Sequence, residues 1–89
     1  MSVRVQLSGQ LVVFAGQTVL TCESAESVTA LMAALVTEVP ALQEALFDGE
    51  GGWRESTLVA VNGQQVIDRN ATPVPDGAEV LLLMPMAGG

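Results

Sequence analysis

Apolar and polar residues follow two different spacings along this chain. Near the start, Val3, Val5 and Leu7 alternate with polar residues, which is the period-2 pattern of a half-buried strand. Residues 18–23 are rich in β-branched and apolar side chains and predict a second strand. The two strands therefore predict a hairpin with a long connection, which contains the short apolar segment 11–14.

The clearest pattern in the chain has the period of a helix. Six apolar residues fall at i, i+3, i+4, i+7, i+8 and i+11 and so share one helical face. They are Val28, Leu31, Met32, Leu35, Val36 and Val39. Ser27 is a suitable N-cap, because its hydroxyl can accept a hydrogen bond from the first turn, and Pro40 predicts the end of the helix. Residues 40–47 predict one further short turn of helix.

Turn residues divide the last third of the chain into three short strands. Residues 58–61 and 65–67 flank Asn62-Gly63, a dipeptide typical of a tight hairpin turn. Residues 72–77 have turn chemistry throughout, and the final strand follows at 79–84. Both faces of this final strand are apolar, which favours a central position in a sheet.

The predicted order is strand, strand, helix, strand, short strand, strand. This order suits an α+β fold of the β-grasp (ubiquitin-like) type, a mixed sheet of four to five strands with one main helix packed on one face. A chain of 89 residues is long enough for one small domain. We therefore expect a β-grasp domain over residues 1–84 and a flexible C-terminal tail over residues 85–89.

Composition restricts the partners of the protein. Ten carboxylates face three arginines, and the sequence has no lysine and no histidine, for a net charge of −7. Such a surface repels phosphate backbones, so we expect no nucleic-acid partner, and it attracts a basic protein partner. No apolar run approaches the ~20 residues that span a bilayer, so we expect no membrane association and a cytoplasmic protein.

The side chains offer little catalytic or metal-binding chemistry. One cysteine and no histidine exclude an ordinary zinc site, and without His, Lys or Tyr we expect no stand-alone enzyme. Cys22 shares a strand face with Leu20, which predicts a small buried hydrophobic side chain rather than a sulfur-handling thiol. Trp53 follows a loop predicted at 48–52, and it would be either a docking anchor or a side chain folded back on the core.

Several segments together resemble the ThiS/MoaD family of ubiquitin-like sulfur carriers, and the resemblance covers nearly all of the chain. The segments are Gly9-Gln10-Leu11-Val12-Val13-Phe14-Ala15-Gly16, Val39-Pro40-Ala41-Leu42, Val61-Asn62-Gly63, Pro75-Asp76-Gly77-Ala78-Glu79-Val80 and the terminal Pro85-Met86-Ala87-Gly88-Gly89. A diglycine that directly follows an apolar strand and a turn of this kind is the most specific of these features.

The resemblance implies a carrier protein without a bound cofactor. In such carriers an E1-like adenylyltransferase uses ATP to adenylate the terminal carboxylate, which here is that of Gly89. Sulfur from a sulfurtransferase or from sulfide then gives a thiocarboxylate, which a sulfur-accepting biosynthetic enzyme consumes. The implied partner-binding residues are those of the tail and its exit: Met84, Pro85, Met86, Ala87 and Gly88.

The residues of the tail suit this chemistry. Gly88 and Gly89 carry no Cβ, so the backbone can pass through a narrow channel and present an unhindered carbonyl. Pro85 stiffens the exit, and the extended segment from Pro85 to Gly89 reaches roughly 15 Å at ~3.3 Å per residue. A frayed terminus or an expression remnant is the alternative explanation of such an ending.

The sulfur acceptor remains open at this point. The segment Leu7-Ser8-Gly9-Gln10-Leu11 looks closer to carriers that feed the biosynthesis of cysteine or of a specialised metabolite. The alternatives are the small subunit of molybdopterin synthase (MoaD-like) and a ubiquitin-like modifier attached to target lysines through Gly89. A plain interaction module with an inert tail is a further alternative.

Overall fold

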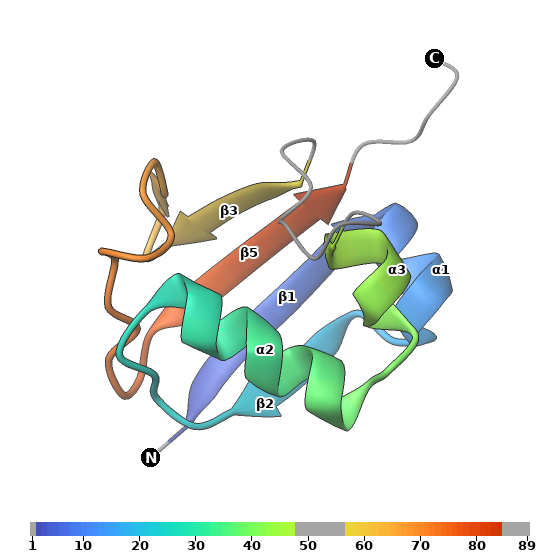
Figure 1. Cartoon of the computed structure of the whole chain (residues 1–89), viewed down its shortest axis with the longest axis horizontal. Helices are drawn as coiled ribbons and strands as arrows, with labels where there is room; N and C mark the ends of the chain where they lie inside the picture. Colours follow the sequence, from blue (N-terminus) through green and yellow to red (C-terminus); the bar gives the residue numbers. More distant parts are fainter. Residues whose placement is uncertain (1, 48–56, 85–89) are drawn as a thin grey trace.

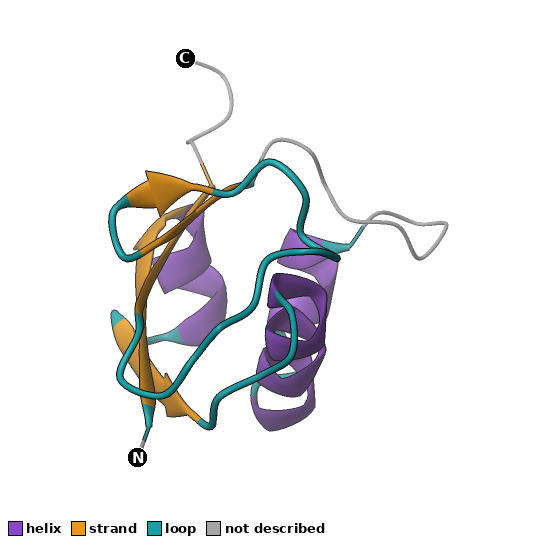
Figure 2. Ribbon diagram, turned by 90° about the vertical axis from the view of Figure 1, so that its left-hand side faces the viewer, coloured by secondary structure: helices purple, strands orange, loops and turns teal. Residues whose placement is uncertain are grey.

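The computed structural model describes residues 2–47 and 57–84. Within these residues five strands form one mixed sheet in the order β2-β1-β5-β3-β4, and the helices lie against one of its faces (Figures 1 and 2). The strands are β1 (Val3–Gly9), β2 (Val19–Cys22), β3 (Leu58–Val61), β4 (Gln64–Gln65) and β5 (Glu79–Met84). The helices are α1 (Gln10–Ala15), α2 (Val28–Glu38) and α3 (Leu42–Leu46). The predicted β-grasp architecture is confirmed.

The last strand occupies the centre of the sheet, as its apolar sequence predicts. β5 pairs in parallel with β1 and antiparallel with β3, while β1 pairs antiparallel with β2. Its two faces are covered unequally, because Val80 and Leu82 are buried against the helices whereas Leu81 is 39% exposed. The strand therefore carries an apolar outer face that no described helix covers.

α2 is the main helix and has the predicted boundaries. The Ser27 hydroxyl accepts a hydrogen bond from the Ala30 N–H at 3.1 Å, which confirms the predicted N-cap. The N–H groups of the first two helical residues donate to carbonyls of the distant turn segment that follows β4, Val28 to Thr72 at 2.8 Å and Thr29 to Arg69 at 3.1 Å. The first N–H groups of a helix have no acceptor within the helix, and here these carbonyls supply one. Four residues of the predicted stripe are fully buried: Val28, Leu31, Met32 and Leu35.

Two connections differ from the sequence-based expectation. The apolar segment at 11–14 lies in the short helix α1, which ends at Gly16 with a hydrogen bond from its N–H to the Val12 carbonyl at 2.8 Å. The strand predicted at 65–67 is instead Gln64–Gln65, although the Val66 N–H still donates to the Val59 carbonyl at 2.8 Å.

In the described part of the chain, no helix has the length and apolar character needed to cross a membrane. Loop 48–52, Trp53 and tail 85–89 lie outside the described residues.

Candidate functional site

The site predicted from the sequence begins where β5 ends. Met84 is the last residue of this strand, is half-buried and packs against the hydrophobic core. The other predicted site residues lie outside the described part of the structure: Pro85, Met86, Ala87, Gly88 and Gly89. Of the predicted site, the structure therefore describes Met84 and its surroundings.

Gly9 lies directly against Met84. It is the parallel partner of Met84 at the end of the β1–β5 ladder, and its backbone has a φ of +68°. A Cβ added to Gly9 would lie 2.2 Å from the Met84 carbonyl oxygen and 3.1 Å from the carbonyl carbon. Only a residue without a side chain fits this approach, so Gly9 is a structural requirement of the tail exit. In the sequence, Gly9 stands out only as part of the segments that resemble the ThiS/MoaD family.

An apolar strip on the open face of the sheet runs up to the tail exit. Alternation along the strands places Leu58, Ala60, Leu81 and Leu83 on the face away from the helices, and we call these four residues the open-face strip. The register pairs Leu58 with Leu83 and Ala60 with Leu81, so the four side chains adjoin across β3 and β5. Leu58 is 44% exposed and Leu81 39% exposed. Adjoining exposed leucines of this kind are typical of a protein-docking surface.

Polar residues border the strip at the far end of β5 from the tail. Arg4 and Glu79 occupy neighbouring positions in the parallel register of β1 and β5. Together with Gln6, Ala60 and Leu81 they line a shallow depression of about 320 Å³ on the open face. The open face thus combines an apolar centre with charges of both signs at one border.

Cys22 is buried in the core, as the sequence predicts. Its side chain is 7% exposed and belongs to the hydrophobic cluster between sheet and helices. Burial, and secondarily the charge of Glu38, raises the pKa of the thiol above its ordinary value of 9.0. The nucleophilic form of cysteine is the thiolate, and both effects disfavour it, so this site does not suit sulfur transfer.

Substituting Cys22 tests its structural role. If Gly89 is loaded with sulfur as the resemblance implies, Cys22→Ala should leave that loading unchanged, and it should lower the free energy of unfolding by about 1 kcal/mol, the cost of a small cavity. Intact-mass analysis of the loaded protein and thermal unfolding measure the two effects. Loss of sulfur loading in a folded Cys22→Ala variant would place the chemistry on this thiol instead.

The raised pKa also predicts how stability depends on pH. The folded state holds the thiol proton more tightly than the unfolded state, so this stabilisation is complete at neutral pH and is lost as the pH rises above about 9. The sequence has no lysine and no tyrosine, so few other side chains titrate in this range. The loss of thermal stability at alkaline pH should therefore be smaller in Cys22→Ala than in the wild type. Identical dependence of the thermal midpoint on pH in the two proteins would contradict this account.

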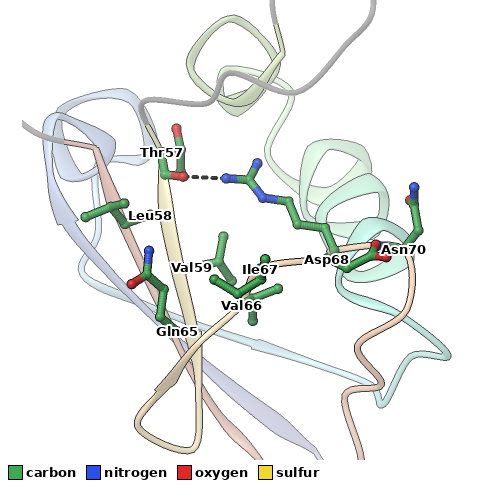
Figure 3. Close-up of a pocket in the computed structure, with 9 residues that line it drawn as sticks. Thr57, Leu58, Val59, Gln65, Val66, Ile67, Asp68 and Asn70 are labelled. Carbon is green, nitrogen blue, oxygen red and sulfur yellow. Dashed lines mark hydrogen bonds between the residues drawn. The ribbon is translucent and has the colours of Figure 1, made fainter.

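The hollow beside β3 and β4 is lined in part by polar residues that support the fold rather than form a catalytic site. It has a volume of about 660 Å³, and hydrogen bonds of Arg69 and Asp68 in its lining hold the turn that follows β4 (Figure 3). The Arg69 guanidinium donates a hydrogen bond to the Thr57 carbonyl. The Asp68 carboxylate accepts hydrogen bonds from the N–H groups of Asn70 at 3.0 Å and Ala71 at 3.2 Å. Among residues 2–47 and 57–84 no cluster of His, Cys, Asp or Glu could hold a metal ion.

Fold and site together define a class of protein. A β-grasp domain whose central last strand leads into a terminal diglycine has the organisation of ubiquitin-like carriers and modifiers. The profile of the ThiS family matches residues 5–89, and the chain therefore belongs to the ThiS family. The match confirms the resemblance seen in the sequence. No curated protein sequence gives a significant match to the chain.

Solved structures of related proteins support this assignment. SAMP1 from Haloferax volcanii is 25% identical and superimposes with a TM-score of 0.88, with all of both chains covered. A chain of the complex of subunits 1 and 2 of the molybdopterin-converting factor from Helicobacter pylori is 26% identical, with a TM-score of 0.62 and both chains fully covered. CysO from Mycobacterium tuberculosis, at 23% identity, shares the fold with a TM-score of 0.76 over 93% of this chain and 98% of its own.

Proposed function

We propose that the protein carries sulfur as a thiocarboxylate on Gly89. An E1-like adenylyltransferase converts the terminal carboxylate and ATP into an acyl-adenylate and pyrophosphate. A sulfur nucleophile then attacks the carbonyl carbon and displaces AMP, and the thiocarboxylate passes its sulfur to a biosynthetic enzyme. In this proposal the protein itself is a co-substrate and not an enzyme, and ATP binds to its activating partner.

One observation carries the proposal: the family match extends to Gly89, and the strand that leads there is anchored in the sheet on both sides. Met84 pairs with Gly9 of β1, which approaches its carbonyl closely, and the preceding residue Leu83 pairs with Leu58 of β3. A rigid base of this kind would let the five residues after Met84 enter a partner's active site while the domain stays outside.

The open-face strip is the proposed docking surface for the activating enzyme. It adjoins Met84, so a partner seated on Leu58, Leu81 and Leu83 would have its active site within reach of the tail. The related molybdopterin-converting factor is solved as a complex of two subunits, which supports a protein partner. Met84 and Met86 would add flexible apolar contacts at the exit.

The carrier function has a direct test by mass. Incubation with the cognate E1-like enzyme, ATP and sulfide should replace one terminal oxygen with sulfur and raise the intact mass by about 16 Da. The matched control is the same protein lacking Gly89, which should dock but should not gain sulfur. An unchanged mass with an enzyme that is active on another carrier would refute the carrier function, and full biological activity of the shortened protein would favour an interaction module.

We infer that the acceptor belongs to the biosynthesis of cysteine or of a specialised metabolite, as the residues of the first connection suggest. A role as small subunit of molybdopterin synthase is the alternative within sulfur transfer, supported by the 26% identity to the molybdopterin-converting factor chain. Mixing the loaded protein with each candidate acceptor enzyme and following loss of the added sulfur would separate the two pathways.

A modifier attached to lysines is the second candidate function. It is supported by the similarity to SAMP1, which is a small archaeal modifier protein. Arg69 is the last basic residue of the chain, so trypsin would leave residues 70–89 on a modified target lysine. Peptides carrying this 20-residue branch, counted from 70 to 89, would identify conjugation, whereas a carrier alone would produce none.

A further inference from the structure

The edge of the sheet formed by β2 exposes backbone groups that the fold does not use. The Leu7 N–H donates to the Thr18 carbonyl at 2.8 Å, which sets the phase of the β1–β2 ladder. In an antiparallel pair the residues alternate, so the N–H and C=O groups of Val19 and Thr21 point away from β1. No described residue forms a hydrogen bond with these outward groups. An extended chain could therefore add to this edge through backbone hydrogen bonds.

A groove lies beside this edge on the helix side of the sheet. It has a volume of about 460 Å³ and runs between the end of β2 and α2, with the buried Cys22 in its lining. On α2 the groove is lined by Ala30 and Ala34, which are four residues apart and so share one helical face. Both alanines are exposed. Their small side chains leave room for the side chains of an added strand.

The rim of the groove carries three carboxylates, those of Glu23, Glu26 and Glu38. All three are exposed, and no ion pair within the described residues neutralises them. Glu38 also lies at the C-terminal end of α2, where the helix dipole adds partial negative charge. A Lys or Arg side chain could lay its aliphatic stem over the alanines and place its charge at this rim.

We propose that this groove, with the β2 edge, binds an extended basic segment of a partner protein as an added strand. The backbone groups of Val19 and Thr21 would pair with the segment, and the carboxylates would select basic side chains. The site goes beyond the proposed carrier function and does not depend on it. Because β1 separates β2 from β5, a partner could occupy the β2 edge while another is docked at the tail exit.

The probe for this site is an eight-residue peptide of alternating lysine and valine with blocked ends. Titration into the isotope-labelled full chain should give saturable amide shifts at Val19, Thr21, Ala30 and Ala34. The same peptide with glutamate in place of lysine should give none. Thr21→Pro removes an outward N–H that β1 does not use, and it should abolish the shifts while keeping the fold.

Charge variants distinguish a built site from general attraction to an acidic protein. Glu23→Gln with Glu38→Gln should weaken the lysine–valine peptide by about fivefold, the effect of two exposed charge pairs. Asp76→Asn with Glu79→Gln changes the net charge equally, but neither residue lines the groove, and affinity should change by less than about twofold. Equal weakening by both pairs, or shifts centred on Leu58 and Leu81, would overturn the proposal.

Discussion

Replacing Gly9 with alanine should lower the free energy of unfolding by about 3 kcal/mol or more, the largest stability effect that we expect from one methyl group in this protein. The added Cβ would lie 2.2 Å from the Met84 carbonyl oxygen, and the φ of +68° is unfavourable for any side chain. The β1–β5 ladder holds both partners, so neither can retreat without loss of pairing. Thermal unfolding followed by circular dichroism should show a midpoint lower by roughly 12 °C or more.

Gly16 offers a matched control for the same substitution. It has a φ of +73° like Gly9, but nothing lies within 4 Å of an added Cβ. Gly16→Ala should therefore show only the cost of the left-handed backbone, about 1–2 kcal/mol. Similar midpoints for the two variants would mean that backbone strain alone explains Gly9, and that Met84 is not held by close approach. A folded Gly9→Ala protein should also be loaded with sulfur more slowly, because the tail would leave from a displaced carbonyl.

Elements whose buried apolar residues follow a complete helix or strand period could be predicted from the sequence. α2 places three turns of apolar residues against the sheet, and its cap is a single serine hydroxyl, so both features are local. The central place of β5 follows equally from its composition. α1 could not be predicted in this way, because its six residues bury only Leu11 and show no full helical period.

Features that depend on contacts between residues far apart in the sequence could not be predicted from it. Gly9 is required because a strand 75 positions later, at Met84, lies beside it, and nothing near Gly9 in the sequence signals this parallel pairing. The open-face strip is a similar case: two apolar faces predict a central position for β5 but do not tell which face the helices leave open. Only the folded structure shows, through its exposure, that Leu81 faces away from the helices, and through the strand register that Leu58 lies beside Leu83.

The second large effect concerns the tail. Gly88→Val should abolish adenylation of Gly89 if the tail passes through a narrow channel of the activating enzyme, because a branched side chain next to the reacting carbonyl would collide with the channel wall. Pyrophosphate exchange with the cognate E1-like enzyme measures adenylation, and the gain of about 16 Da on incubation with sulfide measures the product. Gly88→Ala, with a single methyl group, should lose less activity than Gly88→Val.

Docking should survive the same substitution, because it is proposed to rest on the open-face strip and on Met84 rather than on Gly88. Calorimetry should give the variant nearly the wild-type affinity for the E1-like enzyme, and that affinity should fall as salt rises, since exposed charge pairs are screened. The thermal midpoint should also stay close to that of the wild type, because residue 88 follows the last strand of the sheet. A midpoint lower by many degrees would mean that the tail packs into the fold, and the proposal that it acts as a delivery arm would then have to be abandoned.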